Sequence, residues 1–245
     1  MVQWAGGMLL VDCGFSAREA VLRLQRLGIN AADLTAVLVT HEHGDHIKGV
    51  APLARRFNLP VYMTTGTYRS CHSVRFKAKM GELPDLQLIE GYQSFNLGAL
   101  QVFPVAVPHD AREPCQFIFQ LGRLRLGILT DLGCVSQHVE KQFDDCDALL
   151  VEANHDARML ASGVYPQSLK RRVGGPWGHL NNNQTAMFLE SVNLPRLQHL
   201  VIAHISLQNN TLELVQQALV AAVDQVDSVT WACQEQGFDW LELQC

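Results

Sequence analysis

The stretch Thr40-His41-Glu42-His43-Gly44-Asp45-His46 decides the interpretation of this chain, because it places three imidazoles and a carboxylate side by side. The apolar run before it, residues 36–39, is short and predicts a buried strand. Side chains two residues apart on an extended segment point the same way, so His41 and His43 are placed to bind one ion. Asp45 and His46, beyond the turn at Gly44, are placed to reach a second ion. Imidazole nitrogen and carboxylate oxygen are ligands of Zn²⁺ and similar ions, so the stretch predicts a metal centre.

The composition is that of an ordinary soluble enzyme, with 48% hydrophobic and 18% charged residues in a chain of 245. No apolar run approaches the ~18–20 residues that a membrane span needs, and the N-terminus lacks a secretory signal pattern. We therefore expect a cytoplasmic protein with no membrane partner. The net charge of −5 does not by itself indicate a nucleic-acid binder, so any such function must depend on local basic clusters.

The seven cysteines are scattered and form no C-x-x-C pair. This distribution argues against a disulfide framework or a structural zinc knuckle. We expect most of them to be buried as small apolar side chains.

The chain combines a strand-rich first half with a second half in which strands and helices alternate. This pattern predicts an α/β (α+β) fold, with sheets covered by helices. Neither a linker nor a repeat is evident, so one domain over residues 1–245 is expected. Helices are predicted after Ser16, at 47–57, from Asn182 or Asn183, and at 211–223. Strands are predicted at 8–11, 36–39, 61–63, 86–89, 100–107, 116–121, 124–129, 148–151, 199–203, 229–231 and 240–243.

Three more metal-capable residues come directly after apolar strand segments. They are His109, Asp131 and His204. A histidine after one strand is commonly a solvated loop residue. The same placement at three strand ends, in a chain that already carries the His41–His46 cluster, favours ligands instead.

These features resemble the metallo-β-lactamase superfamily, whose motif H-x-H-x-D-H is followed by a lone His, a lone Asp and a final His. The resemblance spans nearly the whole chain in the same order, and it implies a four-layer αββα sandwich. It assigns seven ligands to two divalent metal ions: His41, His43 and His109 on one, Asp45, His46 and His204 on the other, and Asp131 as a bridge. Zn²⁺ is the expected ion, with Mn²⁺ or iron as alternatives, because such ligand sets accept several metals.

Further segments resemble the YycJ-type subgroup, which is similar to the tRNase Z and PhnP phosphodiesterases. They are Glu152-Ala153-Asn154-His155-Asp156, Gly178-His179-Leu180-Asn181-Asn182 and Ala203-His204-Ile205-Ser206 with Asn209-Asn210. The resemblance implies that His179 faces the scissile phosphate and, with Asp45 and Asp131, serves catalysis. The alternative for His179 is a histidine near a helix N-terminus, since Asn181 can cap a helix.

Two acidic residues are candidates for support of the ligands. Asp12 matches an early aspartate of the superfamily that supports a ligand histidine, although a turn-forming Asp before Gly14 is an equal alternative. Glu152 follows a strand and is a candidate to orient His179; the alternative is a solvated loop residue.

The chain also departs from the subgroup. Members of the subgroup usually begin with an additional strand before the segment equivalent to residues 2–11. Two alternatives follow: the start is truncated, or one sheet edge is a strand short. The usual serine after Gly-His-Leu is replaced by Asn181.

Two ions about 3.5–4 Å apart can share a bridging hydroxide, which would act as the nucleophile. Basic residues for a phosphate-rich substrate lie in two clusters: Arg75 with Lys77, and Lys170 with Arg171 and Arg172. Either cluster alone is often a solvated face. Together they favour a phosphodiesterase, a nuclease or exonuclease acting on DNA or RNA.

Two other functions stay open. One is a glyoxalase II-like thioester hydrolase, which should have a basic site near the C-terminus, whereas residues 211–245 contain no Lys or Arg. The other is a non-enzymatic, metal-stabilised module that binds nucleic acid. Seven ligand candidates disfavour it, because a structural zinc site needs only four ligands.

Overall fold

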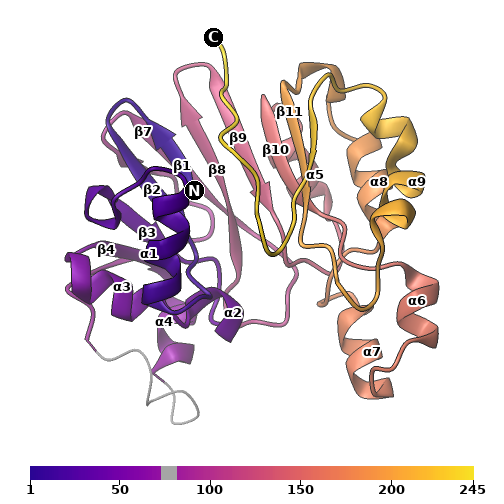
Figure 1. Cartoon of the computed structure of the whole chain (residues 1–245), viewed down its shortest axis with the longest axis horizontal. Coiled ribbons are helices and arrows are strands. Elements are labelled where there is room, and N and C mark those ends of the chain that lie inside the picture. Colours follow the sequence, from indigo (N-terminus) through magenta and orange to yellow (C-terminus); the bar gives the residue numbers. More distant parts are fainter. Residues whose placement is uncertain (73–81) are drawn as a thin grey trace. The chain divides into compact units, whose positions relative to one another are not determined.

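The structure is a computed structural model that describes residues 1–72 and 82–245. The chain divides into two compact units (Figure 1). The first consists of Met1–Ala106 and Ala111–Cys115, and the second of Val107–Asp110 and Gln116–Cys245. A mixed α/β architecture with two sheets confirms the predicted fold class. That the whole chain is one domain stays a prediction.

The first unit holds a five-stranded sheet in the order β1-β2-β3-β4-β5. Its strands are β1 (Val2–Trp4), β2 (Gly7–Val11), β3 (Ala36–Leu38), β4 (Pro60–Thr64) and β5 (Asp85–Ile89). β1 and β2 form an antiparallel hairpin, whereas β2, β3, β4 and β5 are parallel to their neighbours. The parallel strands end at the same edge of the sheet, and the His41–His46 cluster begins there. The antiparallel hairpin of β6 (Phe95–Leu97) and β7 (Leu100–Ala106) also belongs to this unit.

Helices of the first unit are short and amphipathic. Ser16 caps α1 as predicted, by accepting a hydrogen bond from the backbone N–H of Glu19. The buried side chains of α1 and α3 join those of β3 and β4 in one apolar core. The helices are α1 (Ala17–Arg26), the 3₁₀ turn η1 (Ala31–Asp33), α2 (Gly44–Ile47), α3 (Val50–Phe57) and α4 (Thr65–Cys71).

In the second unit the strands run in the order β8-β9-β10-β11-β12. They are β8 (Cys115–Leu121), β9 (Leu124–Leu129), β10 (Ala148–Glu152), β11 (His199–Ala203) and β12 (Val229–Trp231). The predicted tight connection at Gly122 joins β8 and β9, with Gly122 in the left-handed region at φ 61°. β9, β10, β11 and β12 are parallel, so the residues that follow them emerge at one edge.

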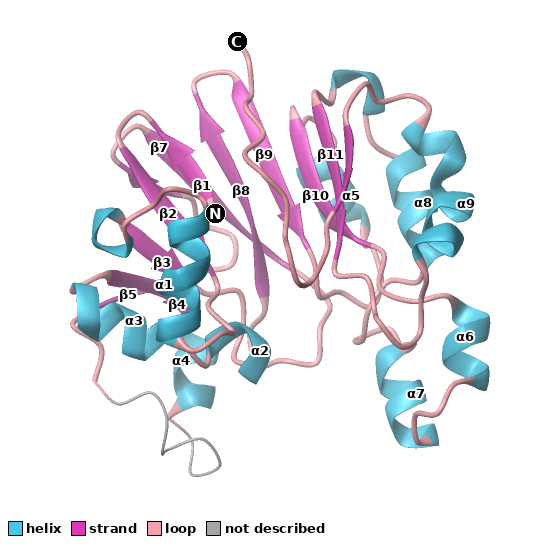
Figure 2. Ribbon diagram, in the orientation of Figure 1, coloured by secondary structure: helices cyan, strands magenta, loops and turns pink. Residues whose placement is uncertain are grey.

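The helices of the second unit include two that lie side by side, α8 (Asn182–Glu190) and α9 (Leu212–Val223), shown in cyan in Figure 2. Asn181 and Gln184 form a capping box that begins α8 where the sequence predicts a helix. The other helices are α5 (Gln137–Phe143), α6 (Ala157–Ser162), α7 (Gln167–Val173) and the 3₁₀ turn η2 (Leu194–Arg196). None of the helices within the described ranges has the length and apolar character that a bilayer crossing requires.

One predicted helix begins later than expected and one predicted strand is wrong. The helix predicted at 47–57 is present as α3 from Val50, and a break separates it from α2. At the break the Gly49 N–H donates to the Cys13 carbonyl at 2.7 Å, and Gly49 packs so closely on Phe15 that an added Cβ would lie 2.0 Å from the Phe15 carbonyl oxygen. The strand predicted at 240–243 does not form. The Glu242 carbonyl in this segment lies 2.9 Å from Nε2 of His199 and so bonds to a side chain instead.

Candidate metal centre

In the first unit, Asp12 and Thr40 lie opposite each other beyond the ends of β2 and β3. The pairing of Val11 with Leu38 brings the two strand ends level. Asp12 has φ 58°, a left-handed conformation that is uncommon for a residue with a side chain. Its Oδ1 accepts the backbone N–H of Thr40 at 2.8 Å and its Oδ2 accepts the Thr40 hydroxyl at 2.7 Å. The strained backbone thus aims a carboxylate at the histidine cluster.

The carboxylate of Asp12 also holds His46. Nδ1 of His46 lies 2.8 Å from Asp12 Oδ2, so the Nδ1 proton is donated to the carboxylate and Nε2 is the candidate ligand atom. Asp12 therefore makes a long-range contact and is not merely a turn residue before Gly14.

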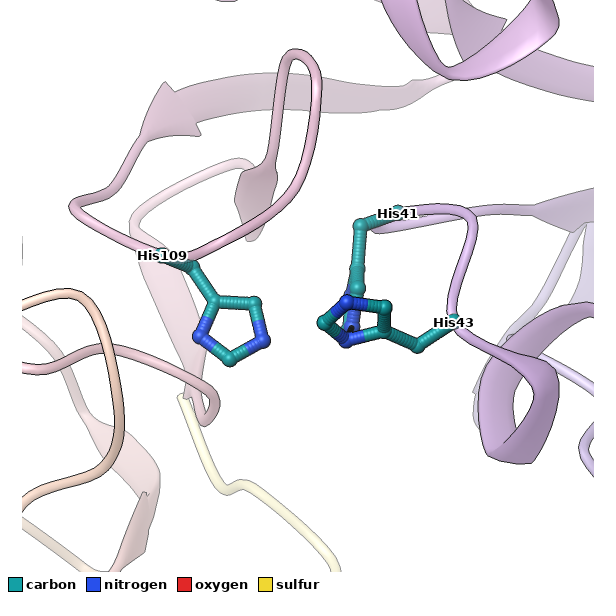
Figure 3. Close-up of side chains that lie close together, drawn as sticks. All are labelled: His41, His43 and His109. Carbon is teal, nitrogen blue, oxygen red and sulfur yellow. Dashed lines mark hydrogen bonds between the residues drawn. The ribbon is translucent and has the colours of Figure 1, made fainter. Parts of the chain in front are cut away.

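Figure 3 draws His41 and His43 on the loop that follows β3, and also labels His109, which belongs to the second unit. Nε2 of His41 and Nδ1 of His43 are 3.0 Å apart. Two nitrogens at this separation fit a common Zn²⁺ ion at about 2.0–2.1 Å from each. His41 is fully buried, and its Nδ1 lies 2.9 Å from the Thr40 hydroxyl. The donor set thus fits the predicted use of His41 and His43 on one ion.

Asp45 lies in the first turn of α2 and its side chain is exposed, with Oδ2 3.8 Å from Nε2 of His46. Its backbone position is set by Gly14, where an added Cβ would be 1.6 Å from the Asp45 carbonyl oxygen. The backbone N–H of Cys13 donates to the His46 carbonyl at 2.7 Å. The loop after β2 therefore fixes the segment that carries Asp45 and His46.

In the second unit, the ends of β9, β10 and β11 bring Asp131, Glu152 and His204 together. Glu152 is paired with Ala203 across β10 and β11, and Val151 with Leu129 across β10 and β9. Asp131 has φ 57° and His204 has φ 55°, so both adopt the same left-handed conformation as Asp12. Such conformations cluster at functional sites.

The Glu152 carboxylate is completely buried and accepts five hydrogen bonds from three segments of the chain. Its Oε2 accepts from the backbone N–H of Asp131 at 3.1 Å, from Nδ1 of His179 at 3.2 Å and from Nδ1 of His204 at 2.9 Å. Its Oε1 accepts the backbone N–H of Leu132 at 3.2 Å and of Leu180 at 2.8 Å. Five donors use the lone pairs of both oxygens, so Glu152 is placed to orient its neighbours. Its carboxylate also belongs, with Asp131, His179 and His204, to a group whose ligand atoms lie within 4.8 Å of one another.

These hydrogen bonds also set the charge of Glu152. Burial acts to raise the pKa of its carboxyl group, but the hydrogen bonds from His179 and His204 and their charges prevail and lower the pKa to about 2. Glu152 is thus an ionised carboxylate, and the alternative of a solvated loop residue is wrong. The contact with His204 was not predicted.

His109 and His179 are both held through Nδ1. Nδ1 of His109 lies 3.0 Å from the Gly178 carbonyl, and the rings of His109 and His179 are 5.3 Å apart. The ring of His179 is 5.2 Å from that of His204, and its Nδ1 is 3.8 Å from Asp131 Oδ1. His109, His179 and His204 therefore all direct Nε2 away from their anchoring oxygens, as histidine ligands do in metal sites.

Two features beside this cluster were missed or left unassigned. A buried amide pair links α8 to the segment before α9: Asn182 Nδ2 donates to Asn210 Oδ1 at 3.0 Å, and Asn210 Nδ2 donates to Asn182 Oδ1 at 2.8 Å. His155 is buried, and among the described residues its Nδ1 has no hydrogen-bond partner. Burial lowers the pKa of His155 to about 4. All three residues stand in polar stretches, where the sequence does not distinguish a buried polar side chain from a solvated one, so neither feature was predictable.

The basic cluster of α7 has partners inside the second unit. Lys170 Nζ donates to the Ala161 carbonyl at 2.7 Å, and Arg172 forms an ion pair with Asp110, the neighbour of His109. Arg171 is exposed. The other predicted pair, Arg75 and Lys77, lies outside the described residues.

Comparison with known proteins gives one family. The family model described as "Beta-lactamase superfamily domain" matches residues 8–205. The exodeoxyribonuclease YycJ of Bacillus anthracis is 36% identical over 89% of this chain and 81% of its own length. The exodeoxyribonuclease WalJ of Streptococcus pneumoniae is 32% identical over the same shares of the two chains. Zn²⁺-bound PqqB of Methylobacterium extorquens has a similar fold, with a TM-score of 0.73 at 20% identity over 100% of this chain and 86% of that one.

Proposed function

The chain belongs to the beta-lactamase superfamily and is a metal-dependent hydrolase of the YycJ type, and we propose that it is a dinuclear phosphodiesterase that degrades DNA. Its substrate is proposed from the names of YycJ and WalJ, the two relatives that match most of the chain. RNA is the alternative nucleic acid.

The proposed ligand set draws on both units. We assign His41, His43 and His109 to one divalent ion and Asp45, His46 and His204 to the other, with Asp131 between them. The histidines held through Nδ1 support this assignment, because an anchored Nδ1 leaves Nε2 to coordinate a metal. Zn²⁺ is the proposed ion, and Mn²⁺ or iron would suit the same nitrogen and oxygen donors.

The observation that carries the proposal is the five-fold hydrogen bonding of Glu152. One buried carboxylate fixes the ring of His204, the ring of His179 and the backbone of Asp131. A protein pays the desolvation of such a charge only where it is fully compensated. Here the compensation comes from two histidines and three backbone N–H groups of the candidate site rather than from a Lys or Arg side chain.

The chain's own residues supply binding and proton transfer. When bound, two divalent ions supply Lewis acidity and lower the pKa of a water molecule. His179 is held by Glu152 through Nδ1, which leaves Nε2 to donate a proton or hydrogen bond to the scissile phosphate or the leaving oxygen. The anionic Glu152 accepts the hydrogen bond from Nδ1 and so orients the ring for that transfer.

Metal content and turnover together test the function. Purified protein should hold close to two equivalents of metal and hydrolyse bis-p-nitrophenyl phosphate, and Asp131→Ala should lose both properties. The exposed Asp224 at the end of α9 offers a matched control, since Asp224→Ala should retain both. One tightly held metal with no phosphodiesterase turnover would contradict the proposal.

A substrate panel then separates the candidate nucleic acids. Double-stranded DNA, single-stranded DNA and RNA should be offered with Zn²⁺ or Mn²⁺, and we expect DNA to be degraded. Turnover of a thioester with no turnover of any nucleic acid would favour the thioester hydrolase instead.

A further inference from the structure

The turn that joins α7 to His179 carries an exposed aromatic side chain. Trp177 lies two residues before His179 in the sequence Gly174-Gly175-Pro176-Trp177-Gly178, and 60% of its surface is accessible. Tryptophan is usually among the more buried residues, because its ring offers a large apolar surface. A single exposed ring is not unusual by itself, so its setting decides its meaning.

The setting is a rigid turn wound onto the end of α7. The backbone N–H of Gly178 donates to the Gly175 carbonyl at 2.9 Å, and the N–H of His179 donates to the Val173 carbonyl at 2.9 Å. An added Cβ would lie 2.6 Å from the Arg171 carbonyl oxygen at Gly175 and 2.1 Å from the Val173 carbonyl oxygen at Gly178. The glycines thus permit a close approach that holds the turn in one conformation.

The same turn is braced by residues of the candidate centre. Nδ1 of His109 donates to the Gly178 carbonyl, and Gly133 approaches so closely that an added Cβ would be 2.3 Å from the carbonyl carbon of Pro176. The backbone at Trp177 is therefore held in place by the contact of His109 with Gly178 and by the hydrogen bond of His179. Little conformational freedom remains to be lost when a flat ligand covers the ring.

The charge around the turn fits a nucleotide. Lys170, Arg171 and Arg172 lie in the last turn of α7. Lys170 donates to the Ala161 carbonyl and Arg172 pairs with Asp110, whereas Arg171 is exposed. An aromatic ring and a cation in one segment are the combination that binds unpaired nucleotides, since the ring stacks on a base and the cation attracts its phosphates. A neutral small substrate would gain nothing from a cation beside the site, so the charge favours a substrate that carries phosphate.

We propose that Trp177 is a specificity-determining residue on which a nucleobase next to the reacting phosphate stacks. The proposal rests on the proposed function for the reaction itself, and it adds that the substrate enters as an unpaired nucleotide. A base in a duplex has both faces covered by its neighbours, so only a single strand or a frayed end offers a face to the indole.

Calorimetric titration of the metal-loaded protein tests this proposal without turnover. The ligands are thymidine 3′,5′-bisphosphate and its base-free analogue, 1,2-dideoxyribose 3,5-bisphosphate, which carry the same phosphates. The wild type should bind the thymidine compound more tightly. Trp177→Ala should weaken that binding at least about fivefold and leave the base-free analogue within about twofold, because stacking depends on the base alone.

Two variants serve as controls. Trp177→Phe keeps a stacking ring and should retain most of the preference for the base. Trp240→Ala removes another exposed indole, 43% accessible, and should change neither affinity. Equal binding of the two ligands by the wild type, failure to bind either, or an equal loss of both in Trp177→Ala would overturn the proposal. A protein that binds as expected but cleaves no phosphodiester would contradict the proposed function alone.

Discussion

Nδ1 of His204 donates to Oε2 of Glu152 at 2.9 Å, and this contact joins the end of β11 to the end of β10 inside the second unit. The same oxygen accepts Nδ1 of His179 and the backbone N–H of Asp131. One carboxylate thus sets the orientation of three residues that are distant in sequence. Its removal should affect all of them at once.

Replacing Glu152 with Gln should weaken metal binding about 10–100-fold, because an oriented ligand histidine would lose its acceptor. The amide would also place its own NH₂ group against N–H donors, so the free energy of unfolding should fall by about 1–3 kcal/mol. Metal titration and urea denaturation measure the two effects. Glu190→Gln on the exposed surface of α8 is the matched control. Unchanged metal affinity in the Glu152 variant would remove this residue from the support of the ligands.

Gly14→Ala should disrupt the segment of Asp45 and His46. The added Cβ would lie 1.6 Å from the Asp45 carbonyl oxygen, so the backbone of one segment has to move. We expect reduced metal stoichiometry, measured by elemental analysis of the purified variant. Gly91→Ala in the same unit is the control, because its Cβ would meet Ala106 at an ordinary 3.5 Å. Retention of the full metal content in Gly14→Ala would show that the close approach is not required.

The amide pair of Asn182 and Asn210 should show strong coupling. Either Asn→Ala change leaves a buried amide without its partner and should cost about 1–3 kcal/mol. The double variant should lose clearly less unfolding free energy than the sum of the two single losses, because it leaves no buried amide without a partner. Denaturant unfolding of the four proteins measures the coupling. Additive losses would mean that the two side chains contribute independently.

Stability should depend on pH through His155. Burial lowers the folded-state pKa of His155 to about 4, whereas the unfolded chain has a pKa near 6.5. Between these values the unfolded state binds more protons, so stability rises with pH over this interval and is lost as pH falls from about 6.5 to 4. His155→Phe should flatten that part of the curve, measured by thermal unfolding at stepped pH. The exposed His138 provides the control, as His138→Gln should leave the slope intact.

The sequence by itself identified the elements whose signals are local. An apolar run followed by polar residues marked the ends of β3, β9 and β11, and Ser16 marked the start of α1. The metal-capable residues were found because they follow such runs directly. Helices α4, α5, α6 and α7 went unpredicted. They are short, and α7 has no buried residue and so lacks the apolar periodicity that marks a helix.

Tertiary structure decided how those residues are oriented. The break between α2 and α3 arises from the close packing of Gly49 on Phe15, and the left-handed backbones of Asp12, Asp131 and His204 are maintained by contacts from other strands. The role of Glu152 depends on donors between residues 131 and 204, far from it along the chain. Sequence patterns extend over a few neighbouring residues, whereas a buried charge is stabilised by whatever the fold brings to it. For this reason the chain alone predicted which residues bear the chemistry, and only the folded structure showed which carboxylate holds the histidines.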